Sequence, residues 1–182
     1  MSLIKNRSLK QLTWIGIGSI VMFFAGLTSA YVVRKPQGNW VEFVLPDWFL
    51  YSTIIIVISS IFLIIANSRF KQQIQSFNFV LYTFLLGVLF SFFQFKGWQE
   101  LTNQGVFLTG KGSNVSGSFL YVITLAHLLH LIGGLIALLI TAIKIKNGKH
   151  TIDNYLGFEL TSIYWHFVGL LWVYLFFFLK YF

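Results

Sequence analysis

The sequence predicts an all-α, polytopic membrane protein built as a bundle of five transmembrane helices. Five apolar runs carry this prediction, because none of them contains Asp, Glu, Lys or Arg. The chain of 182 residues is 57% hydrophobic and only 10% charged, with a mean hydropathy of +0.76. An average soluble domain is about 25% charged, so a soluble fold is excluded.

The predicted helices form a single transmembrane domain over residues 1–182, and we place them at about 12–33, 48–66, 77–95, 117–143 and 160–179. Each run is long enough, at about 1.5 Å of rise per residue, to cross a hydrocarbon core of roughly 30 Å. The fourth run is longer and needs tilt or a protruding end. Barrel strands are disfavoured, because the runs lack barrel alternation and a lone strand leaves its main chain unpaired in lipid.

Polar residues and helix breakers separate the runs. The first run follows a basic start and exceeds the roughly 7 to 15 apolar residues of a secretory signal, so we expect it to remain as a helix. Pro36 and Pro46 are the two prolines of the chain, and both fall in the loop before the second run. The third run is followed by a polar segment, 96–116, whose glycines predict a loop.

Lysines and arginines that flank the runs predict the orientation. With a cytoplasmic N-terminus, the inner segments hold Lys5, Arg7, Lys10, Arg69, Lys71, Lys144, Lys146 and Lys149. The outer segments then hold Arg34, Lys35, Lys96, Lys111 and Lys180. Because cytoplasmic loops carry the excess of positive charge, we predict a cytoplasmic N-terminus and a periplasmic C-terminus.

Composition also removes several classes of protein. The chain has no cysteine, which excludes disulfides, zinc–thiolate sites, iron–sulfur clusters and a cysteine nucleophile. The net charge of +8 is spread over short segments between the apolar runs and forms no basic face with interleaved aromatics. We therefore expect membrane lipids, and no nucleic acid, among the partners.

Histidines within the runs are the most informative polar residues, because a polar group that faces hydrocarbon without a partner is costly. His127 and His130 are three apart and share one face of the fourth predicted helix. His166 lies at a depth similar to that of His130, so an interhelical hydrogen bond between these two is one hypothesis. A b-type heme or copper held by the histidines is a second interpretation. Their spacing, and the missing sulfur and carboxylate ligands, favour structural polar groups over a metal site.

Glu159 begins the fifth predicted helix and shares a stripe with His166. A carboxylate at this position is compatible with proton transfer. It also complements the positive end of the helix dipole, and we favour this second role.

Two motif-rich segments lie in the fourth and fifth predicted helices. Residues 118–134 read SFLYVITLAHLLHLIGG, and residues 159–168 read ELTSIYWHFV. These segments resemble the cytochrome c oxidase subunit III family in the content and order of two motifs. The motifs are His-x-x-His followed by glycine, and Glu-x-x-x-x-Tyr-Trp-His-Phe-Val. Residues 22–31, MFFAGLTSAY, are similar to the third helix of that family. The resemblance spans nearly the whole chain.

The chain departs from the family pattern in helix number and at two carboxylates. Family members commonly have seven helices, and this chain resembles their five-helix C-terminal bundle. The resemblance is therefore to a short, five-helix bacterial form of the family. The loss of two helices preserves the predicted orientation. Ile20 and Gly169 stand where the family has acidic residues, so no role of those carboxylates is carried over.

The resemblance implies an accessory, non-catalytic subunit of a heme–copper terminal oxidase in aerobic respiratory electron transport. Heme and copper would lie on partner subunits and none on this chain. Oxidase subunits I and II, further respiratory-complex subunits and bound phospholipid are the implied partners. The subunit would support the stability and proton uptake of catalytic subunit I. The implied bundle-organising or lipid-contacting residues are His127, His130, Glu159, Tyr164, Trp165 and His166.

Three other functions stay open at this point. Subunit III of a quinol oxidase and an accessory protein of nitric oxide reductase fit the same resemblance. A membrane b-type cytochrome is a more distant alternative.

Overall fold

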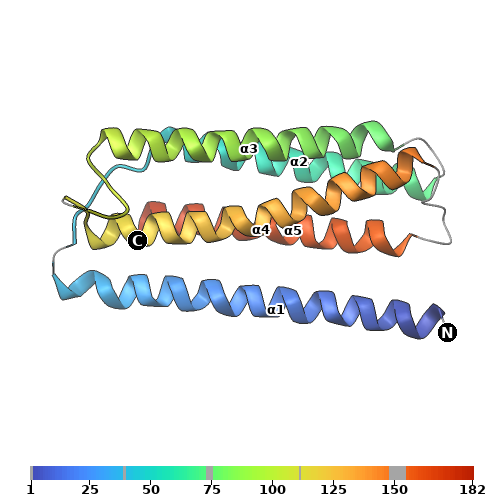
Figure 1. Ribbon diagram of the computed structural model, residues 1–182, viewed down its shortest axis with the longest axis horizontal. Coiled ribbons are helices and arrows are strands. Elements are labelled where there is room, and N and C mark those ends of the chain that lie inside the picture. Colours follow the sequence, from blue (N-terminus) through green and yellow to red (C-terminus); the bar gives the residue numbers. More distant parts are fainter. Residues whose placement is uncertain (1, 39, 73–75, 111, 148–154) are drawn as a thin grey trace.

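The chain runs back and forth along one axis in five long helices (Figure 1). The computed structural model describes residues 2–38, 40–72, 76–110, 112–147 and 155–182, with the main chain alone for 2–5. The helices are α1 Ser2–Arg34, α2 Asp47–Lys71, α3 Phe77–Asn103, α4 Val115–Lys146 and α5 Leu156–Tyr181, and a short 3-10 helix, η1 Lys35–Gln37, follows α1. All five long helices are apolar enough to cross a membrane, and the described residues include no strand. The all-α class with five spans is thereby confirmed.

Every helix extends beyond the apolar run that predicted it. α1 already includes Ser2, and α5 begins at Leu156. α3 continues through Lys96 to Asn103, so the loop expected from residue 96 begins only after Asn103. The helical hydrogen bonds of the main chain are favourable in polar surroundings as well as in lipid, so a helix does not have to end where its apolar run ends.

α3 ends in a cap that requires a glycine. The N–H of Gly105 donates to the carbonyl of Thr102 over 3.1 Å, and the N–H of Val106 donates to the carbonyl of Leu101 over 2.9 Å. This pair of bonds places the intervening residue in the left-handed region, and Gly105 has a φ of 79°. Val106 is buried, so the cap directs the chain back onto the bundle before α4.

The five helices pack unevenly (Figure 1). α2 and α3 lie side by side, α4 and α5 lie in the middle, and α1 lies along α4 and α5 on the other side. The large hydrophobic core joins α2 to α5, and among the described residues no α1 side chain belongs to it. A smaller core, here called the α1 core, attaches α1; it consists of Phe24, Tyr31, Ile123, Leu171, Leu175 and Phe178.

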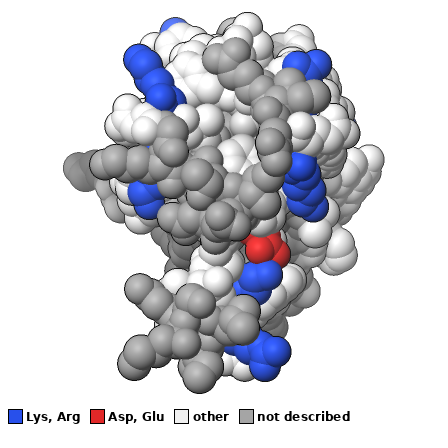
Figure 2. Space-filling view, turned by 90° about the vertical axis from the view of Figure 1, so that its right-hand side faces the viewer, with Lys and Arg blue, Asp and Glu red and all other residues white. Residues whose placement is uncertain are grey.

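The chain ends lie at opposite ends of the bundle (Figure 1), as an odd number of spans requires. Figure 2 shows the end where α1 begins, with basic side chains around a small acidic area. The described basic residues that belong to the helix termini at this end are Arg7, Lys10, Arg69, Lys71, Lys144 and Lys146. Of the residues that predicted the orientation, Lys111, Lys149 and the side chain of Lys5 lie outside the described residues. The orientation in the membrane stays a prediction.

Candidate functional site

Two tryptophans join α5 to α2 in the middle of the bundle. Trp165 donates its indole N–H to the hydroxyl of Ser59 over 3.1 Å, and Trp172 donates to the hydroxyl of Thr53 over 2.9 Å. Both rings are fully buried. Seven residues separate them, so they lie two turns apart on one face of α5. The N–H is the only polar group of an indole, so these bonds leave both rings satisfied.

The accepting hydroxyls are held in place by their own helix. Ser59 donates to the carbonyl of Ile56 over 2.8 Å, and Thr53 donates to the carbonyl of Phe49 over 2.7 Å. Each hydroxyl proton is therefore used within α2, and each oxygen offers a lone pair to a tryptophan. These partners were not predicted, although a hydroxyl residue inside an apolar run is the signal that identifies them.

α3 contributes two more bonds of the same kind. Gln94 donates from Nε2 to the hydroxyl of Ser52 over 2.9 Å. Trp98 donates from its indole N–H to the hydroxyl of Thr124 on α4 over 3.0 Å. Each of the helices α2 to α5 thus takes part in at least one buried or partly buried bond from an indole or amide N–H to a hydroxyl.

Tyr164 and Trp165, two of the predicted site residues, both contact neighbouring helices. The Tyr164 hydroxyl donates to the carbonyl of His130 on α4 over 3.0 Å. The ring of Trp165 lies where α3 presents Gly87 and α4 presents Gly134. These two glycines let the helices approach the ring closely, as small residues do in membrane bundles.

His127 is buried but is not hydrogen-bonded. Its ring is fully enclosed, with the centroids of Trp172, Phe90 and Phe24 at 5.0, 5.9 and 6.4 Å. Neither ring nitrogen has a partner among the described residues. His127 therefore packs as an aromatic ring between α1, α3 and α5.

His130 and His166 face different neighbours, so the hydrogen bond predicted between them is wrong. The Nδ1 of His130 lies 2.7 Å from the carbonyl of Ala126 one turn earlier, and because a carbonyl only accepts, this nitrogen carries the proton. The ring of His130 packs against Phe23 and Phe24 of α1. His166 instead lines a groove that α5 forms with α2. Similar depth along two helices does not fix which way the side chains point around each helix axis.

The described residues bring together no group of three His, Cys, Asp or Glu side chains that could hold a metal ion. The ring of His127 is surrounded by the rings of Phe24, Phe90 and Trp172. The geometry therefore favours packing and helix contacts over ligation for these side chains.

Glu159 pairs with a cation that sequence analysis did not assign to it. Its Oε1 lies 2.8 Å from the Nζ of Lys10, with the two side chains 31% and 44% exposed. The pair joins the first turn of α5 to α1 at the end shown in Figure 2. The topology contained the signal, since the odd-numbered helices, α1 and α5 among them, begin at the same end of the bundle.

Tyr155 lies beside this ion pair, just before α5. Its hydroxyl donates to Oδ1 of Asn67 at the end of α2. Burial raises the pKa of Tyr155, the bond to Asn67 lowers it, and the charge of Glu159 raises it, with a net rise. The phenol therefore keeps its proton, and with it the bond to α2, at any pH near neutrality.

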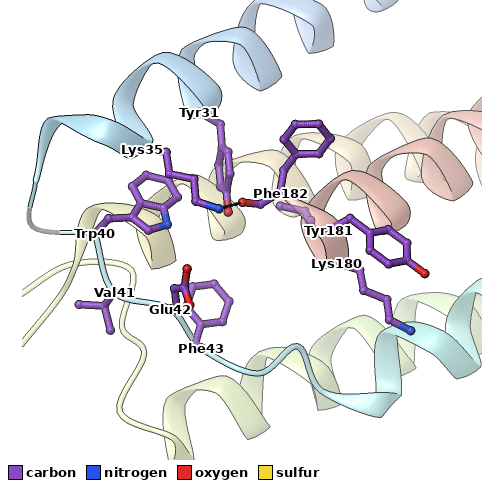
Figure 3. Close-up of a pocket in the computed structure, with 10 residues that line it drawn as sticks. Tyr31, Lys35, Trp40, Val41, Glu42, Phe43, Lys180, Tyr181 and Phe182 are labelled. Carbon is purple, nitrogen blue, oxygen red and sulfur yellow. Dashed lines mark hydrogen bonds between the residues drawn. The ribbon is translucent and has the colours of Figure 1, made fainter.

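A pocket at the opposite end of the bundle lies between α1 and α5 (Figure 3). Its volume is about 220 Å³, and Tyr31, Lys35, Trp40 and Glu42 form part of its wall. Lys35 donates to the main-chain oxygen of Phe182 across the pocket (Figure 3). The rings of Tyr31 and Trp40 meet edge to face, with centroids 4.7 Å apart. The bond from Lys35 therefore joins η1, just after α1, to the residue that follows α5.

Comparison with known proteins places these helices in a family. Residues 40–182, which include all of α2 to α5, match the family model described as Cytochrome c oxidase subunit III. The chain belongs to the cytochrome c oxidase subunit III family. This confirms the resemblance and makes the chain a multi-pass membrane protein.

Relatives from the subunit III family cover most of the chain. A protein of Nocardia farcinica named "Probable cytochrome c oxidase subunit 3" is 32% identical over 90% of this chain and 83% of its own length. One of the same name from Mycobacterium tuberculosis is 30% identical over 93% of this chain and 88% of its length. The "Cytochrome c oxidase subunit 3" of Rhipicephalus sanguineus is 38% identical over 60% of this chain, but the chain spans only 40% of that protein. The likeness to these bacterial relatives covers more of the chain than residues 40–182, so it extends into α1.

Proposed function

We propose that the chain is an accessory subunit III of a heme–copper terminal oxidase of the cytochrome c oxidase type. It packs against catalytic subunit I, subunit II is a further partner in the complex, and heme and copper lie on these partner subunits. It binds phospholipid and supports the stability and the proton uptake of subunit I during aerobic respiration. The assembly lies in the inner membrane of a bacterium, with the N-terminus of this chain in the cytoplasm.

The observation that carries the proposal is the family match over residues 40–182. The geometry agrees with an accessory role, because several polar side chains of α5 bond to neighbouring helices. Trp165 and Trp172 bond to α2, Tyr164 bonds to α4, and Glu159 bonds to α1.

The predicted site residues take structural roles in this proposal. Tyr164, Trp165 and Glu159 hold α5 against α4, α2 and α1, while His127 and His130 pack against aromatic rings at the junction with α1. A rigid α4 and α5 would present a fixed surface to subunit I. Support of the catalytic subunit then follows from packing, without a reacting group on this chain.

Affinity purification of the tagged chain from native membranes in mild detergent tests the proposal. We expect a heme–copper catalytic subunit to co-purify, identified by mass spectrometry, with a Soret band in the complex. After separation from its partners, the chain should have no Soret band. A Soret band on the separated chain, or purification without any terminal oxidase, would contradict the proposal.

Electron-donor assays on the purified complex separate the related functions. Oxygen consumption with reduced cytochrome c supports the cytochrome c oxidase type. Activity with a quinol alone assigns the chain to a quinol oxidase, and turnover of nitric oxide assigns it to a nitric oxide reductase.

A further inference from the structure

A groove on the outer side of α2 and α5 combines an apolar wall with two polar side chains. It has a volume of about 330 Å³ and is lined by Val57 and Ser60 of α2 and by His166, Gly169 and Leu170 of α5. An added Cβ at Gly169 would lie 3.3 Å from the Ser60 Oγ. The two helices therefore approach each other closely at the floor of the groove.

His166 and Ser60 have no hydrogen-bond partner among the described residues. Ser60 differs in this from its neighbour Ser59, which donates to Ile56 and accepts from Trp165. His166 lies near the middle of α5, Leu156–Tyr181, and hence near the middle of the membrane. Polar side chains at this depth face protein or a water-filled cavity rather than hydrocarbon.

We propose that a transmembrane helix of a partner subunit docks in this groove and hydrogen-bonds to His166 and Ser60. A neutral imidazole offers one donor and one acceptor, and a hydroxyl offers both. The matching side chain on the partner is therefore one that also donates and accepts, such as an amide, a hydroxyl or a protonated carboxyl group. Val57 and Leu170, both exposed, would pack against the apolar residues of the same helix.

A lipid fits the groove less well than a helix does. An acyl chain fills the apolar part but leaves the imidazole and the hydroxyl unpaired. A phospholipid headgroup carries the right polar atoms but lies at the membrane surface, about half the hydrocarbon thickness away from His166. Polar complementarity at mid-depth thus favours a protein helix.

Photo-crosslinking in intact native membranes tests this inference. p-Benzoylphenylalanine replaces Leu170, which is 70% exposed beside the groove, and in a matched control it replaces Leu129 on the outer face of α4, which is 62% exposed. We expect a light-dependent adduct of defined mass at position 170, with a transmembrane peptide of another protein identified by mass spectrometry, and a clearly lower yield of that adduct at position 129. Adducts of Leu170→p-benzoylphenylalanine with phospholipid alone, or with a second copy of this chain, would overturn the proposal.

The hydrogen bond itself is tested by adding His166→Leu or His166→Gln to the crosslinking variant. One hydrogen bond between membrane helices corresponds to roughly a three- to tenfold change in association, so His166→Leu should lower the adduct yield by about that factor. His166→Gln keeps a donor and an acceptor and should restore most of it. Equal yields for Leu, Gln and His at position 166 would refute the role of the imidazole.

The identity of the partner, the catalytic oxidase subunit, rests on the proposed function. The outcomes of the experiment test the docking groove and the oxidase assignment separately. An adduct with a membrane protein unrelated to oxidases supports the docking groove and contradicts the oxidase assignment. Co-purification with an oxidase, together with lipid adducts alone at position 170, supports the assignment and refutes the groove.

Discussion

Trp165 of α5 lies so close to Gly87 of α3 that a Cβ on residue 87 would stand 2.5 Å from Cη2 of the indole. The same ring donates its N–H to Ser59 of α2. One side chain thus fixes the distance between α5 and two other helices. The contact depends on a residue without a side chain at position 87.

Gly87→Ala should destabilise the bundle by about 1–3 kcal/mol, as overpacking of a filled core does. The Trp165 ring is fully buried and cannot move aside without losing its bond to Ser59. Thermal unfolding in detergent, followed by tryptophan fluorescence, measures the change. Gly26→Ala on α1 is the control, because nothing lies within 4 Å of its added Cβ. Equal melting temperatures for the two variants would mean that α3 and α5 are not in this contact.

Trp172→Phe should lower the free energy of unfolding through the lost bond to Thr53. Hydrogen bonds between membrane helices contribute about 0.6 kcal/mol on average and up to roughly 1.7 kcal/mol. A double-mutant cycle with Thr53→Val isolates that coupling from the lost ring volume. The two substitutions should be less than additive. Strict additivity would show that the indole and the hydroxyl do not interact.

His127→Phe should leave stability unchanged or raise it. The imidazole is enclosed by aromatic rings and has no hydrogen bond among the described residues, so the substitution removes the desolvation cost of two ring nitrogens and keeps an aromatic side chain in place. Unfolding in detergent measures this, with Tyr164→Phe, which does remove a bond, for comparison. A loss above about 2 kcal/mol would reveal a polar partner for His127.

Lys10→Gln should cost less than about 1 kcal/mol, because both members of the ion pair with Glu159 are partly exposed and screened by solvent. The difference from wild type should shrink as salt is raised. The exchange variant, Lys10→Glu with Glu159→Lys, should recover most of the loss. If Lys10→Gln weakens stability equally at low and high salt, the effect does not come from the charges.

The positions of the five helices follow from one-dimensional patterns in the sequence. Apolar runs are sufficient to locate the five helices, because lipid admits few other arrangements of the main chain. The ends of the helices were placed too far inward, as at Lys96, because helices also continue in polar surroundings.

The contacts between helices could not be predicted in the same way. The hypothesis of a hydrogen bond between His130 and His166 was wrong. The sequence indicates how deep each side chain lies in the membrane, but not the direction in which it points around its helix axis. Tyr164 and Trp165 were selected by family resemblance, and their partners, His130 and Ser59, became visible only once the neighbouring helices were placed. The pair of Lys10 and Glu159 needed nothing beyond the topology and was overlooked.

The separation of the α1 core from the large core bears on how the family varies in length. The contacts that close α2 to α5 into a bundle include no α1 side chain among the described residues, and the family match begins at residue 40, after α1. A chain that differs ahead of α2 would therefore keep the same contacts in the large core, whichever helices precede them.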